Sequence, residues 1–294
     1  MLESTFRCLP GIGPSREREL WRLGFVRWSD LPAEGPILSP RIDDRLRGAV
    51  NEARELLARR DAAGLAARLP VNERWRLWTD AFEAATCFLD IETDGGADTV
   101  TVVGVFDARG PHAFVKGVNL EGPGLGETLA RSAIVVTFNG SSFDLPVLRR
   151  AFPDLPLPPV HVDLLHLWRR LGARGGLKAL ERKMGLPRPG TVEGMDGFEA
   201  VRLWKRWELE RDGAALRRLV EYNLYDCIQL RPLLDLARNR MVEAEALPLP
   251  ARPVYERGDV LYDVSRLLLA LPEGRDGRGT GEGEGRAGHA PSSE

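Results

Sequence analysis

Residues 88–93 have the sequence Phe-Leu-Asp-Ile-Glu-Thr, and the interpretation of the whole chain depends on them. They follow an apolar run and precede an Asp-Gly-Gly turn, which predicts a buried strand that ends at a turn. Side chains alternate faces along a strand, so Asp90 and Glu92 should point to one side and Ile91 to the other. Two neighbouring carboxylates repel each other and lose water, and a divalent cation relieves both costs. An edge strand with two solvated acids is the alternative interpretation.

The composition is that of an ordinary soluble globular chain. Of the 294 residues, 43% are hydrophobic and 29% are charged, and the formal net charge is −2. Nucleic-acid binding would therefore need local basic surfaces. The three cysteines are far apart and form no C-x-x-C pair, so neither a zinc site nor a disulfide framework is predicted. The sequence shows no signal peptide and no membrane-length apolar run, so we expect no membrane contact and a cytoplasmic location.

Composition divides the chain into four parts. We expect a helical module over residues 1–80, an α/β domain over 81–246, a linker with a possible docking helix over 247–272, and a disordered tail over 273–294. The linker is rich in proline, and the tail consists mainly of Gly, Glu, Arg and Ser. Within the helical module, residues 41–68 predict one long helix.

The N-terminal module contains a Leu-Pro-Gly-Ile-Gly turn that precedes a helix. Gly11 and Gly13 would leave backbone N–H groups exposed at the positive end of the helix dipole, where a phosphate can bind. The stretch resembles a helix-hairpin-helix motif. This resemblance implies contact with a nucleic-acid backbone that does not depend on the base sequence. A plain helical turn is the alternative.

The α/β domain shows a β-β-β-α-β-α-β pattern followed by helices. The first and fourth strands of this order should be neighbours in a mixed sheet. The fourth strand runs into residues 139–148, so Asp144 should lie at its carboxyl end, where ligands bind in open α/β sheets. A late helix over 214–240 carries Tyr222 and Asp226 one turn apart, on one face.

Four acids are therefore expected at one edge of the sheet: Asp90, Glu92, Asp144 and Asp226. Such a cluster would bind two Mg²⁺ or Mn²⁺ ions roughly 3.5–4 Å apart, an arrangement suited to in-line displacement at phosphorus. We expect Asp163 to cap the helix that begins at Leu164, with a place at the site edge as the alternative. Lys178 and Arg182 are expected on a solvated helix face rather than at a substrate phosphate.

The order of three motifs, D-x-E, N-G-x-x-F-D and Y-x-x-x-D, resembles that of the DEDDy 3′–5′ exonuclease superfamily. The phrases T-F-N-G-S-S-F-D-L-P-V-L and Y-N-L-Y-D-C are similar to those in proofreading domains of B-family DNA polymerases. The chain resembles the YprB-type ribonuclease-H-like family most, over residues 84–240. This resemblance includes the segment G-L-K-A-L-E-R-K-M-G-L. The resemblance implies a ribonuclease-H-like mixed five-stranded sheet flanked by helices.

The resemblance also implies residue roles. The four acids would hold the ions, and Tyr222 would orient or help deprotonate the attacking water. Glu221 stands where another subgroup has histidine, so the tyrosine subtype is indicated. Asn139, Gly140 and Phe143 would brace the second motif and contact the terminal nucleotide. The alternatives are a turn with no role in binding for Asn139 and Gly140, and core packing for Phe143.

The predicted activity is metal-dependent hydrolysis of a nucleic acid from its 3′ end, with release of nucleoside 5′-monophosphates. The N-terminal motif favours DNA slightly over RNA. A ribonuclease-H-fold endonuclease and a non-catalytic nucleic-acid-binding module are the alternatives.

Overall fold

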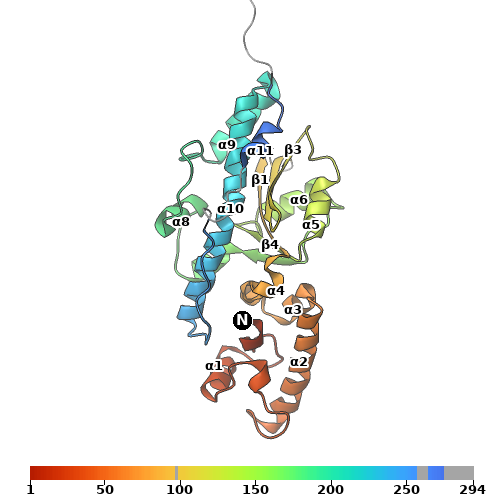
Figure 1. The fold of residues 1–294 in the computed structure, drawn as a ribbon, viewed down its shortest axis with the longest axis vertical. Coiled ribbons are helices and arrows are strands. Elements are labelled where there is room, and N and C mark those ends of the chain that lie inside the picture. The colour runs from red at the N-terminus through yellow and green to blue at the C-terminus, as the bar shows by residue number, and fades with distance from the viewer. Residues whose placement is uncertain (97–98, 257–263, 275–294) are drawn as a thin grey trace, which may run out of the picture.

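A mixed five-stranded sheet forms the centre of the molecule, with strand order β3-β2-β1-β4-β5 (Figure 1). The first three strands form an antiparallel meander, and the last two run parallel to β1 and to each other. The strands are β1 (Thr86–Thr93), β2 (Val100–Asp107), β3 (Gly110–Val115), β4 (Ile134–Thr137) and β5 (Val160–Asp163). The predicted fold class is confirmed, including the pairing of the first and fourth strands.

The alternation of side chains in β1 separates two apolar layers. Leu89 and Ile91 pack with α5 (Gly124–Ala130) and α6 (Asp144–Ala151), which cover one face of the sheet. On the other face, α10 (Gly213–Ala244) runs along β1 and β2 (Figure 1). The acids of β1 therefore face α10, as the two-residue period predicts.

The other helical elements precede the sheet or flank α10. They are η1 (Leu2–Ser4), α1 (Pro14–Arg22), η2 (Trp28–Asp30), α2 (Pro40–Ala58), α3 (Ala62–Arg68), η3 (Val71–Leu77), α4 (Asp80–Glu83), α7 (Leu164–Arg170), α8 (Leu177–Met184), α9 (Gly197–Glu210) and α11 (Val264–Leu269). Among the described helices, none has the length and apolar character needed to cross a membrane.

The prediction of one helix over residues 41–68 is wrong, because the helix is interrupted between α2 and α3. Arg60 has a left-handed backbone with φ 53°, which cannot continue a right-handed helix. Asp61 then caps the new helix by accepting a hydrogen bond of 2.7 Å from the backbone N–H of Gly64. Periodicity alone does not reveal this break, since both helices have similar apolar spacing.

The N-terminal segment (residues 1–80) shares a continuous apolar core with the α10 face of the sheet. A buried ion cluster lies at the same junction. Arg76, only 1% exposed, contacts Glu17 at 3.0 Å, Glu73 at 2.7 Å and Glu245 near the end of α10 at 2.8 Å. The division of the chain at residue 80 stays a prediction.

The structure, a computed structural model, describes residues 1–96, 99–256 and 264–274. The predicted docking helix corresponds in part to α11, and Gly274 forms a single antiparallel bridge with Asp212. Residues 275–294 of the predicted disordered tail lie outside the described residues.

Candidate metal centre

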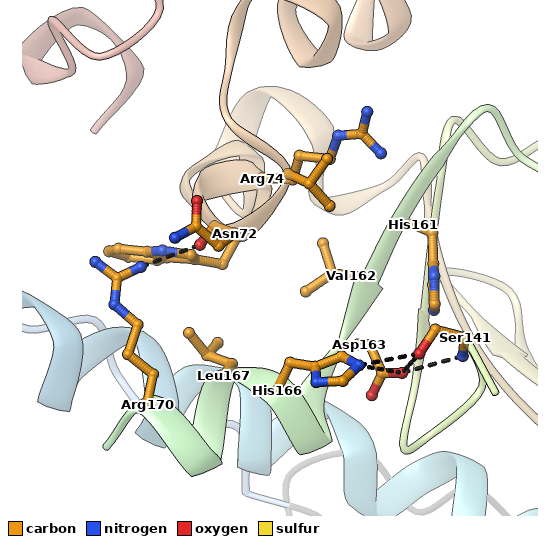
Figure 2. Close-up of a pocket in the computed structure, with 11 residues that line it drawn as sticks. Asn72, Arg74, Ser141, His161, Val162, Asp163, His166, Leu167 and Arg170 are labelled. Carbon is orange, nitrogen blue, oxygen red and sulfur yellow. Dashed lines mark hydrogen bonds and ion pairs between the residues drawn. The ribbon is translucent and has the colours of Figure 1, made fainter. Parts of the chain in front are cut away.

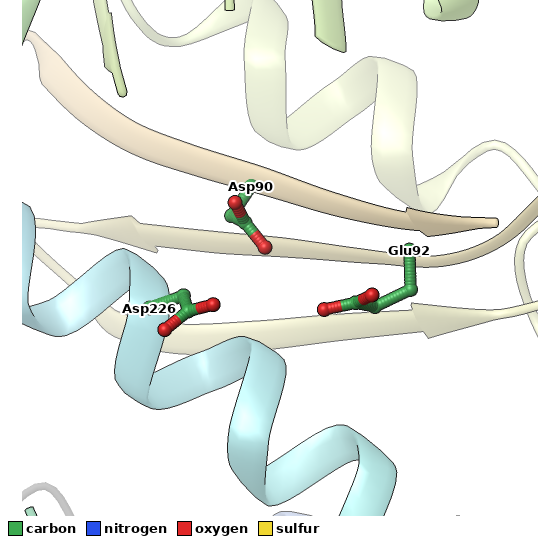
Figure 3. A group of neighbouring side chains, drawn as sticks. All are labelled: Asp90, Glu92 and Asp226. Atoms are coloured by element: carbon green, nitrogen blue, oxygen red, sulfur yellow. The ribbon is translucent and has the colours of Figure 1, made fainter. Parts of the chain in front are cut away.

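Three of the four predicted ligands gather between β1 and α10. One carboxylate oxygen from each of Asp90, Glu92 and Asp226 lies within 4.8 Å of the others. Figure 3 shows the three side chains directed into the same space, two from the strand and one from the helix. Residues far apart in the sequence thus supply a compact set of oxygen donors.

Asp144 joins this group at its edge rather than at its centre. It is the first residue of α6 and is buried, and its Oδ1 accepts a hydrogen bond of 3.2 Å from the backbone N–H of Ile91. Ile91 separates the two acids of β1, so this bond fixes Asp144 beside them. The predicted placement of Asp144 at the carboxyl end of β4 therefore brings it to the cluster.

The acids carry crowded negative charge. Burial raises the pKa of Asp90 and of Glu92 well above the usual values, and the nearby Asp226 raises both further. Burial also raises the pKa of Asp144 to about 7. Hard carboxylate oxygens held together at this cost fit a divalent cation.

Two cations from α8 and the loop after it contact the same cluster. The Nζ of Lys178 donates to the hydroxyl of Tyr222 and lies 3.4 Å from Asp226 Oδ2. The Nη2 of Arg188 donates to Asp226 Oδ1, and Glu181 accepts two further bonds of 2.6 Å from the same guanidinium. The expectation that Lys178 lies on a solvated face is wrong, because α8 packs against α10.

A family model described as the RNase_H superfamily matches residues 87–238. The chain belongs to the RNase_H superfamily. The matched range begins in β1 and ends in α10, so it contains all four acids. Among solved structures, the EXO domain of Nibbler from Aedes aegypti is similar, with 14% sequence identity and a TM-score of 0.39. The similarity covers 67% of this chain and 91% of that one. No curated protein matches the chain.

In this RNase_H superfamily domain, the turn between β4 and α6 is held firmly. Asn139 has a left-handed backbone with φ 68°, and its N–H donates to Asp163 at 2.8 Å. At Gly140 an added Cβ would lie 2.6 Å from Thr137 Cβ, so a larger residue does not fit. Asp163 also accepts a bond of 3.0 Å from Leu165 N–H, so the predicted helix cap is confirmed.

The remaining predicted site residues lie on the surface or in the N-terminal segment. Phe143 is 41% exposed, so the alternative of core packing is wrong for it. Gly11 has φ 77°, and Gly13 is the N-cap of α1. These two glycines lie away from the acids in sequence and fold, and their contact with a nucleic-acid backbone stays a prediction.

Sequence reasoning missed two further residues that shape the cluster. The Nδ2 of Asn223 donates to Asp90 Oδ2 at 2.9 Å and so orients this carboxylate. Gly104 of β2 is paired with Asp90 and lets α10 approach the sheet closely. A glycine within a β-branched strand signals such an approach, and this signal was present in residues 99–106.

We predict that Gly104→Ala weakens the cluster by displacing α10. The added methyl would lie 2.8 Å from Cys227 Sγ and would also overlap Asn223 Oδ1. Both side chains are buried, so they cannot move aside without cost. We expect a loss of about 1–3 kcal/mol in the free energy of unfolding and weaker Mn²⁺ binding. Chemical denaturation and calorimetric titration measure the two effects. Gly48→Ala, on an exposed position of α2 with nothing within 4 Å, is the control and should not destabilise.

Proposed function

We propose that the protein is a divalent-metal-dependent nuclease that hydrolyses phosphodiesters from the 3′ end of a nucleic acid and releases nucleoside 5′-monophosphates. The observation that supports it most is the convergence of Asp90, Glu92 and Asp226, with Asp144 fixed alongside. Family membership agrees with this fold, and the order of the three motifs favours the DEDDy class. DNA is the slightly favoured substrate.

The four acids would hold two Mg²⁺ or Mn²⁺ ions. When bound, such ions stabilise negative charge on a phosphoryl group and increase the acidity of a water molecule. The chain supplies the positioning. Asn223 orients the Asp90 carboxylate, and the bond from Ile91 N–H orients Asp144. Tyr222, one turn before Asp226, would orient the attacking water through its hydroxyl.

Arg188 is proposed to donate to a non-bridging oxygen of the scissile phosphate. Its guanidinium is fixed by Glu181, and its Nη1 is buried without a hydrogen-bond partner among the described residues. A buried donor without a partner is costly, and a phosphate oxygen would supply the missing acceptor. Its second contact, with Asp226, places it beside the oxygen donors.

We therefore predict that Arg188→Met lowers kcat/KM on a 3′-labelled oligonucleotide by on the order of 10²-fold. Arg188→Lys should recover part of the rate because the charge returns without the planar geometry. Arg182→Met removes an exposed charge from the neighbouring α8 and is the control, with unchanged kcat/KM. A full rate for Arg188→Met would remove Arg188 from the proposed mechanism.

The exonuclease and endonuclease alternatives give different products. A linear oligonucleotide labelled at its 5′ end should shorten one nucleotide at a time in Mn²⁺, and a circular single strand of the same sequence should stay intact. Cleavage of the circle would identify an endonuclease instead. A non-catalytic module would leave both substrates whole while still binding them.

A further inference from the structure

A separate cavity of about 430 Å³ lies beside the β4–α6 turn. Figure 2 shows its walls, which come from η3 of the N-terminal segment on one side and from β5 and α7 on the other. Trp75, Val162 and Leu167 give it a mainly apolar lining, and Asn72 and His166 add polar groups at its edge. A cavity of this size and character suits a compact organic ligand.

The cavity is linked to Asp144 through the β4–α6 turn. Ser141 lines the cavity and lies three residues before Asp144. Its hydroxyl donates to Asp163 Oδ2 at 2.6 Å and lies 3.1 Å from His166 Nε2. The turn that carries Asp144 to the acids is therefore also a wall of the cavity, and one ligand strand could reach both places.

The chemistry of the lining suits one nucleoside unit and its phosphate. His161 and His166 present planar rings, on which nucleobases stack. Arg170 is already ion-paired with Glu73 at 2.9 Å. Arg74, by contrast, makes no ion pair with any residue that the structure describes. Its Nε is buried and has no hydrogen-bond partner among those residues. Of the two arginines among the described residues that line the cavity, Arg74 therefore has the guanidinium that is available to a phosphate at the rim.

We propose that this cavity binds one nucleoside unit of the substrate strand, next to the phosphodiester that lies at the acids. The proposal rests on the proposed nuclease function and deepens it. It makes the N-terminal segment a part of the substrate site, because η3 supplies one of the two walls. The ligand class is a single-stranded nucleic acid, whose unstacked bases are free to enter a cavity.

Binding measurements in a full-length chain with Asp144→Asn, a change expected to prevent turnover, test the proposal. We expect Arg74→Ala with His166→Ala to weaken binding of a fluorescein-labelled single strand about 5- to 150-fold, which corresponds to the ~1–3 kcal/mol of one base contact. Arg109→Ala removes an exposed charge at the turn after β2, at the opposite end of β1 from Glu92, and should leave the dissociation constant unchanged. Equal melting temperatures would show that the variants are folded.

Photocrosslinking locates the bound unit. A single 4-thiothymidine is placed in turn at each of the last positions of the strand, and the crosslinked peptide is identified by mass spectrometry. We expect one position near the 3′ end to crosslink within residues 71–77 or 161–167. Unchanged affinity of the double variant, or crosslinks confined to other peptides, would overturn the cavity assignment alone. If the Asp144→Asn chain and every variant made in it failed to bind the strand, the nuclease function would be overturned as well.

Discussion

Asp90→Asn should lower the rate of cleavage of a 3′-labelled oligonucleotide by on the order of 10²–10³-fold. Asp90 supplies one of the three clustered oxygen donors and is oriented by Asn223. The amide has nearly the same volume and can still accept the bond from Asn223, so the change removes charge and little else. Single-turnover kinetics in Mn²⁺ measure the loss without interference from product release.

The same variant distinguishes the loss of a metal ligand from the loss of folding stability. Burial among other acids raises the pKa of Asp90, so its charged form opposes folding when no cation is bound. In the presence of a chelator, the melting temperature of Asp90→Asn should therefore equal or exceed that of the wild type. Mn²⁺ should raise the melting temperature of the wild type by several degrees at about 100 times its dissociation constant, and that of the variant much less. Wild-type rates in Asp90→Asn would exclude this carboxylate from the reaction.

Arg76→Met should cause the largest loss of stability, about 3–5 kcal/mol in the free energy of unfolding. Arg76 is buried and contacts Glu17, Glu73 and Glu245. Burial already raises the pKa of Glu17, while Arg76 opposes that rise. Without the guanidinium, buried carboxylates would have to remain charged and unpaired or take up protons. We expect the melting temperature to fall by roughly 10 °C in differential scanning calorimetry.

Arg59→Met is the matched control for this prediction. Its ion pair with Glu55 spans 3.5 Å between exposed side chains at the C-terminal end of α2, where solvent screens the charges. We expect no measurable change in melting temperature. If Arg76→Met were as stable as this control, the buried ion cluster would not be what joins the N-terminal segment to α7 and α10.

The sheet and the acids could be predicted because they depend on local patterns. The two-residue period of β1 places Asp90 and Glu92 on one face, and the four-residue spacing places Tyr222 and Asp226 on one helix face. The order of elements then pairs β1 with β4, which brings Asp144 to the cluster. Each step uses spacing along the chain.

The residues that were missed depend on contacts between elements. Arg188 lies in a loop rich in proline and glycine, and only the packing of α8 against α10 brings it to Asp226. The same packing turns Lys178 from a surface residue into a neighbour of Tyr222. The cavity beside Ser141 requires the N-terminal segment to fold back against β5, which no periodicity specifies.

Calorimetric titration of the full-length protein with Mn²⁺ tests the central claim most directly. The wild type should bind about two ions per chain, and Asp90→Asn combined with Glu92→Gln should lose this binding while keeping its melting temperature in chelator. Equal Mn²⁺ binding by the wild type and the double variant, or none by the wild type, would contradict the assignment of these acids as a metal centre.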